Sequence, residues 1–194
     1  MRTVTTITNY YTFDELSKEA QEKALDDYIY KTVDLRNDMF YEDTKNALEY
    51  IFPNSELDVQ YQLSHCQGDG LEFFGKMNGL DLLEFLKNDL SEDAYNGLLE
   101  LLKETTFELE PHRWGYYIQS YGYFYSELLD SDYEGCYSKA LMLEFADLAH
   151  DKLSEVCKKL EKNGYEYLYE PNREAMVEEI LINEYEFFED GTLA

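Results

Sequence analysis

The sequence predicts an α+β fold: a mostly antiparallel sheet packed against several helices, in one compact acidic domain covering residues 1–194. Two kinds of apolar periodicity predict it. Some segments repeat apolar residues every three or four positions, as helices do, and others alternate apolar and polar residues, as half-buried strands do. The composition can supply a real core, because 44% of the residues are hydrophobic and 16% are aromatic.

The N-terminal part is expected to form one strand and two helices. Residues 3–13 alternate β-branched and aromatic side chains, which is typical of a strand. Ser17 can cap the first helix, and Pro53 would end the second. The apolar face of the first helix consists of Ala20, Ala24, Leu25, Tyr28 and Ile29, and that of the second of Met39, Phe40, Ala47, Leu48 and Ile51.

A β-hairpin is expected next. Its first strand alternates polar residues with Leu57, Val59, Tyr61 and Leu63. Asp69-Gly70 is a strong signal for a two-residue type I′ turn, which needs positive φ at both residues. Residues 71–77 would return as the second strand, in a register that buries Leu71 and Phe73 beside the apolar residues of the first.

The middle of the chain predicts two further helices and two strands. Residues 80–104 are rich in leucine and helical, with a break where Ser91 can cap a new helix. Residues 105–129 are aromatic and predict two strands that turn near Pro111.

The C-terminal part predicts two helices and a strand. A long helix is expected over residues 138–163, ended by Gly164. Its apolar face consists of Leu141, Phe145, Leu148, Ala149, Leu153, Val156, Cys157 and Leu160. Asn172 can cap a short helix, and residues 185–193 are expected to form a last strand with a turn at Asp190-Gly191.

The charge is the most unusual property of the chain. Forty-two Asp and Glu oppose sixteen Lys and Arg, so the net charge is −26. A charge of that size repels nucleic acid and anionic membranes and destabilises the compact state by self-repulsion. It therefore calls for a basic partner, a cation or a high-salt environment.

The acids gather in three stretches. No base follows Arg173, seven acids face one lysine between residues 88 and 111, and four acids recur at spacings of three, four and four on the long helix. The residues expected to contact a partner are Glu144, Asp147, Asp151, Glu155, Asp93, Glu100, Glu104, Glu174, Glu178, Glu186, Glu189 and Asp190.

Such spacing can imitate a phosphate ladder. Helix positions three or four apart have Cβ atoms about 5–6 Å apart, near the separation of successive phosphates on one strand. A folded chain of this mass should expose about 9,600 Å², or one net charge per roughly 370 Å². Duplex DNA carries about one charge per 100 Å². Mimicry therefore requires the acids to cluster on one side.

Three segments carry a resemblance to a protein family. They are residues 11–17 (YTFDELS), 67–70 (QGDG) and 183–191 (NEYEFFEDG). Together they resemble a family of small, acidic, uncharacterised proteins encoded by phages and prophages. The resemblance implies a viral accessory protein in a bacterial cytoplasm, and it assigns no functional residue.

No catalytic residue, cofactor or metal site is expected, and the chain is not expected to be an enzyme. Residues 130–135 resemble the start of a calcium loop, but Leu141 stands where a bidentate Glu is required, so cation binding there stays open. His65 is expected to be half-buried, His150 to form a surface ion pair and Cys157 to lie in the core. Three cysteines without a CxxC pair indicate a reducing cytoplasm.

The favoured function is a phage-encoded inhibitor of a host defence protein of the CRISPR or restriction type. It would bind stoichiometrically and imitate nucleic acid through its clustered carboxylates, in the bacterial host cytoplasm. The alternatives are a small ligand- or cation-binding accessory protein and a structural protein that self-associates. The aromatic run at residues 114–125 is expected to form part of the sheet core. It does not suit direct nucleic-acid binding, because only one base, Arg113, lies beside it.

Overall fold

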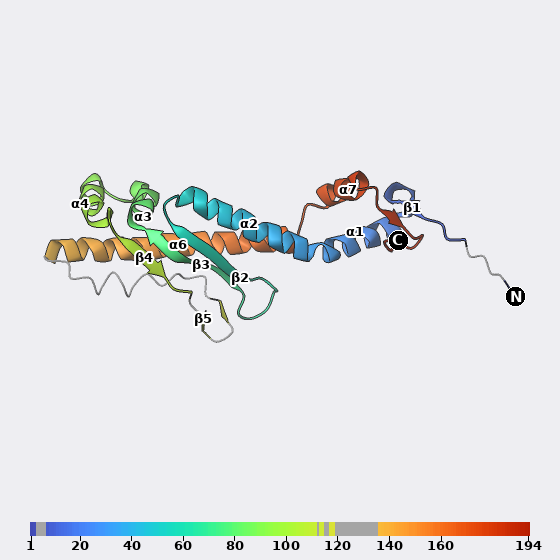
Figure 1. Ribbon diagram of the computed structural model, residues 1–194, viewed down its shortest axis with the longest axis horizontal. Helices are drawn as coiled ribbons and strands as arrows, with labels where there is room; N and C mark the ends of the chain where they lie inside the picture. Colours follow the sequence, from blue (N-terminus) through green and yellow to red (C-terminus); the bar gives the residue numbers. More distant parts are fainter. Residues whose placement is uncertain (3–6, 112, 115–116, 119–135) are drawn as a thin grey trace. The chain divides into compact units, whose positions relative to one another are not determined.

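A computed structural model describes residues 1–2, 7–111, 113–114, 117–118 and 136–194 (Figure 1). The chain groups into two compact units, the terminal unit (residues 1–38 and 166–194) and the central unit (residues 39–165). The fold class is α+β with antiparallel strands, as the sequence predicts. One domain over residues 1–194 stays a prediction.

The central unit contains the main sheet. Strands β2 (Glu56–Gln62), β3 (Gly70–Asn78) and β4 (Thr106–Leu109) pair antiparallel with β3 in the middle. Val59 lies opposite Phe73 and Tyr61 opposite Leu71, which confirms the predicted register. Strands lie on both sides of Pro111, as predicted, but β5 (Arg113–Trp114) pairs with β6 (Tyr117–Ile118) and β4 pairs with β3. The described strands on either side of Pro111 are therefore in different sheets. The remainder of the predicted aromatic strands, residues 119–129, lies outside the described residues.

The predicted two-residue turn at Asp69-Gly70 is wrong. Gln62 and Gly70 are paired, so the connection between the strands is residues 63–69. Positive φ occurs in this loop at His65 (57°) and Gly68 (105°), and not at Gly70. The Asp69 carboxylate binds several groups within the loop and thereby stabilises a wider connection than a type I′ turn.

Three helices of the central unit lie in a row along the sheet (Figure 1). They are α2 (Val33–Ile51), α3 (Gly79–Phe85) and α4 (Glu92–Leu102), with a short 3-10 turn, η2 (Lys87–Asp89), before α4. The predicted break is confirmed, because the Ser91 hydroxyl accepts the Ala94 N–H at 3.2 Å and caps α4.

The predicted apolar face of α2 is only half correct. From Phe40 onward its buried side chains recur every four residues and continue just past the helix end: Phe40, Thr44, Leu48 and Phe52. Met39, Ala47 and Ile51 are exposed instead, because a row at spacing four is the one that meets the sheet. The Phe40 ring packs 5.1 Å from Tyr61 and the Phe52 ring 6.4 Å from Phe73.

The long helix is α6 (Cys136–Tyr169). Most of its predicted apolar face is buried, and Leu148, Val156 and Leu160 are half-buried. Cys157 contacts the backbone of Phe73, so α6 packs on β3. Gly164 does not end the helix, which is a correction. A Cβ at Gly164 would overlap Leu63 and stand 2.8 Å from the Phe40 ring, so glycine there permits close packing.

The terminal unit joins the two ends of the chain. β1 (Tyr11–Thr12) pairs with β7 (Glu186–Phe187), and η1 (Phe13–Glu15), α1 (Lys18–Lys31) and α7 (Arg173–Ile182) surround one apolar cluster. Both predicted strands are shorter than expected among the described residues, since 7–13 contains only the two residues of β1 and 185–193 contains β7 with a bridge to Leu193. Residues 3–6 lie outside the described residues.

Caps and one buried arginine stabilise the helix ends of the terminal unit. Ser17 caps α1 and Asn172 caps α7, as predicted. Arg36, only 5% exposed, donates to the carbonyl oxygens of Ile29 (2.7 Å) and Leu168 (2.9 Å). These carbonyls lie in the last turns of α1 and α6, where a cation is favoured.

Candidate acidic interface

The four acids of α6 share one exposed side, as predicted. Glu144, Asp147, Asp151 and Glu155 are all exposed, and at 100° per residue they fall within about a quarter of the helix circumference. At a rise of 1.5 Å per residue the row is about 16 Å long. The opposite side of α6 is buried against the sheet, so packing forces these carboxylates into solvent.

Bases border this row, which the prediction overlooked. The Lys152 ammonium lies 2.9 Å from Asp89 and 4.0 Å from Glu155. Both pairs are partly exposed to solvent, so each contributes little stability. Lys158, Lys159 and Lys162 follow Glu155 at spacings of three, four and seven and lie on the same side by helical geometry. The spacing of these lysines in the sequence already indicated that bases follow the acids on this side of the helix. They limit the row to four carboxylates.

The predicted acids near α4 are exposed as well. Asp93 lies in the first turn, where a negative charge is favoured by the helix dipole. Glu100 pairs with Lys103 at 2.6 Å, and Glu104 follows the end of the helix. Part of the negative charge at α4 therefore stabilises the helix itself.

The other predicted acids belong to the terminal unit. Glu174 and Glu178 are exposed on α7, Glu186 on β7, and Glu189 just after it. Asp190 accepts hydrogen bonds from Lys23 (2.8 Å) and the Thr192 N–H (2.9 Å), which hold the pKa of its carboxyl well below its usual range. Asp190 thus fastens the C-terminal loop to α1, whereas its neighbours face solvent.

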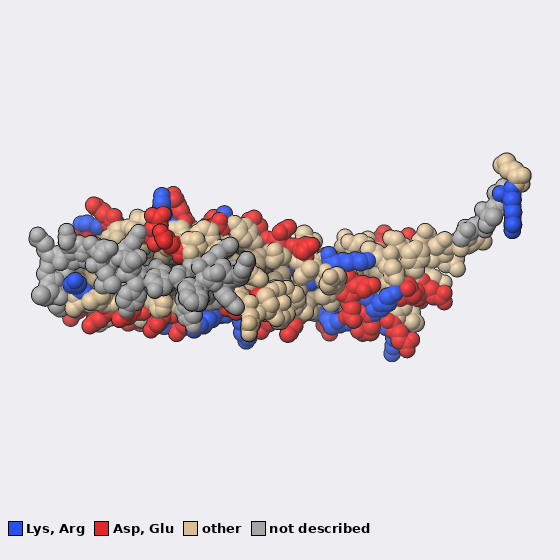
Figure 2. Space-filling model, turned by 90° about the horizontal axis from the view of Figure 1, so that it is seen from below, with Lys and Arg blue, Asp and Glu red and all other residues tan. Residues whose placement is uncertain are grey.

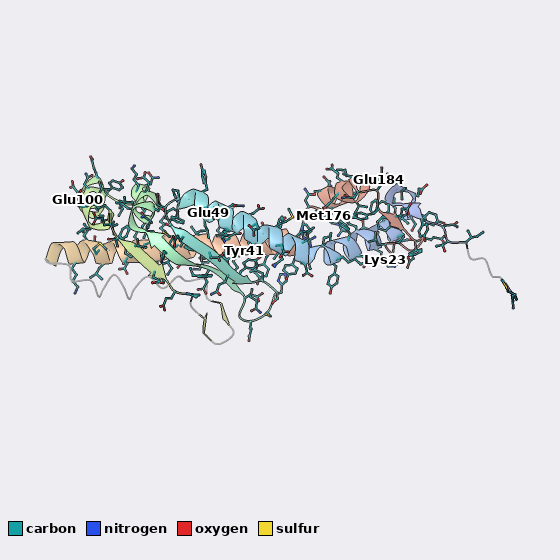
Figure 3. The ribbon with its side chains drawn as sticks, in the orientation of Figure 1. Lys23, Tyr41, Glu49, Glu100, Met176 and Glu184 are labelled. Carbon is teal, nitrogen blue, oxygen red and sulfur yellow. The ribbon has the colours of Figure 1, made fainter. Side chains whose placement is uncertain are left out.

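The α2 helix adds exposed acids to the central unit that the prediction did not include. Glu42, Asp43 and Glu49 are exposed on it, and Figure 3 shows Glu49 on α2 and Glu100 on α4, on either side of α3. On the face drawn in Figure 2, acidic side chains lie along both edges of the central unit, interspersed with fewer Lys and Arg. The acidic surface therefore extends beyond the single row on α6.

Some acids are used by the fold. Asp81, 6% exposed, accepts the Asn54 N–H at 2.7 Å and the Ser55 hydroxyl at 2.8 Å. Asp58 is partly buried, which opposes its ionisation, but hydrogen bonds from Tyr41 and the Val59 N–H outweigh this and lower its pKa. These two carboxylates hold loops and strands together.

Three other predicted sites have different outcomes. His65 is exposed, with its ring 4.7 Å from that of Tyr165, so its half-buried placement is wrong because the wide loop turns it outward. Cys157 lies in the core, as predicted, and burial raises the pKa of its thiol to about 12. The calcium-like segment 130–135 lies outside the described residues.

Among the described residues, no group of three or more His, Cys, Asp or Glu is arranged to hold a metal ion. None of the described helices has the length and apolarity needed to cross a bilayer.

The mean charge density requires clustering. The area of about 9,600 Å² expected for a folded chain of this mass gives one net charge per roughly 370 Å², far below the density of about one per 100 Å² on duplex DNA. Only local rows such as that on α6 can resemble a phosphate backbone.

Comparison with known protein families, with curated proteins and with solved structures found no match. The resemblance to acidic phage proteins therefore stays a prediction.

Proposed function

We propose that this protein binds a basic, nucleic-acid-binding protein and occupies the groove that holds nucleic acid there. The observation that supports this proposal is the exposed row of Glu144, Asp147, Asp151 and Glu155 on α6. The phage resemblance makes a bacterial defence protein the first partner to test, namely a CRISPR effector or a restriction enzyme. The protein would then be a phage-encoded inhibitor acting in the host cytoplasm.

Electrostatics gives the proposed complex its rate and its specificity. A surface with net charge −26 attracts a basic groove over long distances and repels acidic competitors. Carboxylates spaced like phosphates can meet the same Lys and Arg side chains that bind a nucleic-acid strand. Inhibition of this kind is stoichiometric and needs no catalytic residue.

The test is a titration of candidate defence proteins with this protein, with and without competing nucleic acid. We expect competition with nucleic acid, loss of activity in proportion to inhibitor added, and affinity that falls steeply as salt rises. Affinity that is unchanged between low and high salt would contradict the electrostatic mechanism. Inactivation of the target by a small fraction of its concentration would instead indicate catalysis.

One cavity supports a second candidate, the binding of a small ligand. It has a volume of about 700 Å³ and lies in the terminal unit. Apolar and aromatic side chains such as Ile29, Tyr30 and Val33 line it, together with the charged residues Asp26, Arg36, Glu170 and Arg173. That volume suits a small molecule. A thermal-shift screen against metabolite-sized compounds tests it. A stabilising compound whose effect disappears in Val33→Trp would support this candidate, and one unaffected by the substitution would not.

A further inference from the structure

A groove in the central unit combines exposed apolar side chains with an acidic rim. It is formed by the end of α2, by α3 and by α4, and has a volume of about 590 Å³. Tyr50 is 89% exposed, Ile51 41% and Leu99 37%, and all three line it together with Pro53, Phe85 and Tyr95. Single exposed apolar residues are ordinary, but several around one hollow mark a binding surface.

The charges around the groove are mainly negative. Glu84 lines it, Glu49 precedes Tyr50 on α2, and Glu100 follows Leu99 on α4 (Figure 3). One lysine already shows how a base is held there: the Lys87 ammonium lies 2.8 Å from Glu84 and 5.3 Å from the centre of the Tyr95 ring. A carboxylate and an aromatic face together favour a cation at that edge.

The walls of the groove also restrict the backbone of an occupant. They consist mainly of side chains from α2, α3 and α4, with Pro53 and Asn54 of the turn after α2. The carboxylate of Asp81, which also lines the groove, is already bonded to Asn54 and Ser55. An extended peptide needs a sheet edge to satisfy its backbone, whereas a helix satisfies its own. The groove therefore suits an amphipathic helix with apolar anchors on one face and Lys or Arg beside them.

We propose that this groove binds an amphipathic basic helix of the partner and supplies the apolar anchor of the complex. The inference rests on the proposed function for the partner's identity, and on the groove alone for the chemistry of recognition. Buried aromatic and aliphatic anchors carry most of the energy of an interface, while charges at the rim act mainly on association rate. The α6 row would then steer the partner, and the groove would retain it.

The test uses a synthetic 18-residue helical peptide with Leu at positions i, i+3, i+4 and i+7 and Lys on the other face. A scrambled peptide of equal composition and charge serves as its control, and binding is measured by fluorescence anisotropy. We expect the amphipathic peptide to bind at least tenfold more tightly than the scrambled one. Equal affinity of the two peptides would overturn the proposal.

A matched pair of variants locates the binding. Leu99→Asp adds a negative charge and removes an apolar anchor, and Leu181→Asp makes the same change at a residue of similar exposure, 40%, on α7. We expect Leu99→Asp to weaken binding of the amphipathic peptide about tenfold, although the added charge alone would strengthen it, and Leu181→Asp not to weaken it. Equal effects of the two substitutions would overturn the proposal, and thermal melts confirm that both variants fold.

A second pair removes only apolar contact. Tyr50→Ala should weaken binding of the peptide several-fold, whereas Tyr10→Ala, at a tyrosine 53% exposed in the terminal unit and outside both cavities, should not. The two proposals also fail in different ways. Peptide binding that depends on Leu99, without binding to any defence protein, would retain the groove and reject the inhibitor. Binding to a defence protein that depends on the α6 row, without effects of Leu99 or Tyr50 on the peptide, would reject the groove alone.

Discussion

Asp69 shows how one carboxylate can organise a loop. It accepts the backbone N–H groups of Ser64 (2.6 Å) and Cys66 (3.1 Å), and the Tyr165 hydroxyl of α6 also donates to it. Burial opposes its ionisation, but hydrogen bonds from Tyr165, Cys66 and Ser64 outweigh this and hold the pKa of Asp69 well below its usual range. Asp69 is therefore a structural residue that joins the hairpin loop to α6.

Replacing Asp69 by Asn should destabilise the fold by about 1–3 kcal/mol at pH 7, because charge-assisted hydrogen bonds are lost. The folded-state pKa lies below the unfolded value of about 3.9, so this stabilisation is complete above that value and is lost as pH falls toward the folded-state pKa. The difference in unfolding free energy between the two proteins, measured in urea, should therefore shrink between pH 7 and pH 3.

Asp43→Asn, on the exposed side of α2, is the matched control and should change stability by less than 0.5 kcal/mol or so. If Asp69→Asn instead melts like the unmodified protein and loses binding to a partner, the loop is a functional site.

Gly75 requires glycine for a reason invisible in the sequence. Its φ is 115°, and a Cβ there would overlap the carbonyl oxygen of Glu56 on the neighbouring strand. Gly75→Ala should destabilise the central unit by about 2–4 kcal/mol through backbone strain and overpacking. Gly97→Ala is the control, because its new Cβ meets only the end of the Leu141 side chain. The free energy of unfolding of this variant, measured by chemical denaturation, should lie within about 1 kcal/mol of that of the unmodified protein. Equal losses at the two positions would refute this account.

At the scale of the element, α6 serves both the core and the proposed interface. Its apolar side packs on β3 and its carboxylate row faces solvent, so the row can be changed without touching the core. Converting Glu144 and Glu155 to Gln and Asp147 and Asp151 to Asn should leave folding intact. Binding to a basic partner should weaken by at least tenfold, measured by titration calorimetry, because rim charges act together.

The control for that quadruple variant removes the same charge elsewhere. Asp14, Glu19, Asp34 and Asp38 are exposed in the terminal unit, and their amide forms should retain most of the binding. If the control variant loses binding and the α6 variant does not, the contact face lies on the terminal unit.

At the scale of the whole molecule, net charge opposes folding. Salt screens the repulsion among the charges that make up the net charge of −26, and this stabilises the fold. Salt also weakens ion pairs, but pairs such as Lys23–Asp190 and Lys103–Glu100 are exposed and contribute little to stability. The melting temperature should therefore rise between 20 mM and 500 mM NaCl, and each 1 kcal/mol gained corresponds to roughly 2–4 °C for a chain of this size. A fall in melting temperature would show that pairs such as Lys23–Asp190 outweigh the repulsion.

The sequence by itself determined the local elements and the charge. The helices capped by Ser17, Ser91 and Asn172 and the pairing of β2 with β3 follow from signals within a few residues, since helix caps and side-chain periodicity are local properties. The carboxylate row on α6 was predictable for the same reason, because helical spacing alone places its members on one side.

Only the tertiary structure decided which residues meet across the chain. A glycine at position 164 predicts the end of a helix, but in the structure it allows α6 to pack closely against Phe40 and Leu63. Asp69 binds Tyr165 from far along the chain, and α2, α3 and α4 together form the groove that none of them suggests alone. These outcomes depend on packing between distant segments, where side-chain volumes and hydrogen-bond partners outweigh local preference.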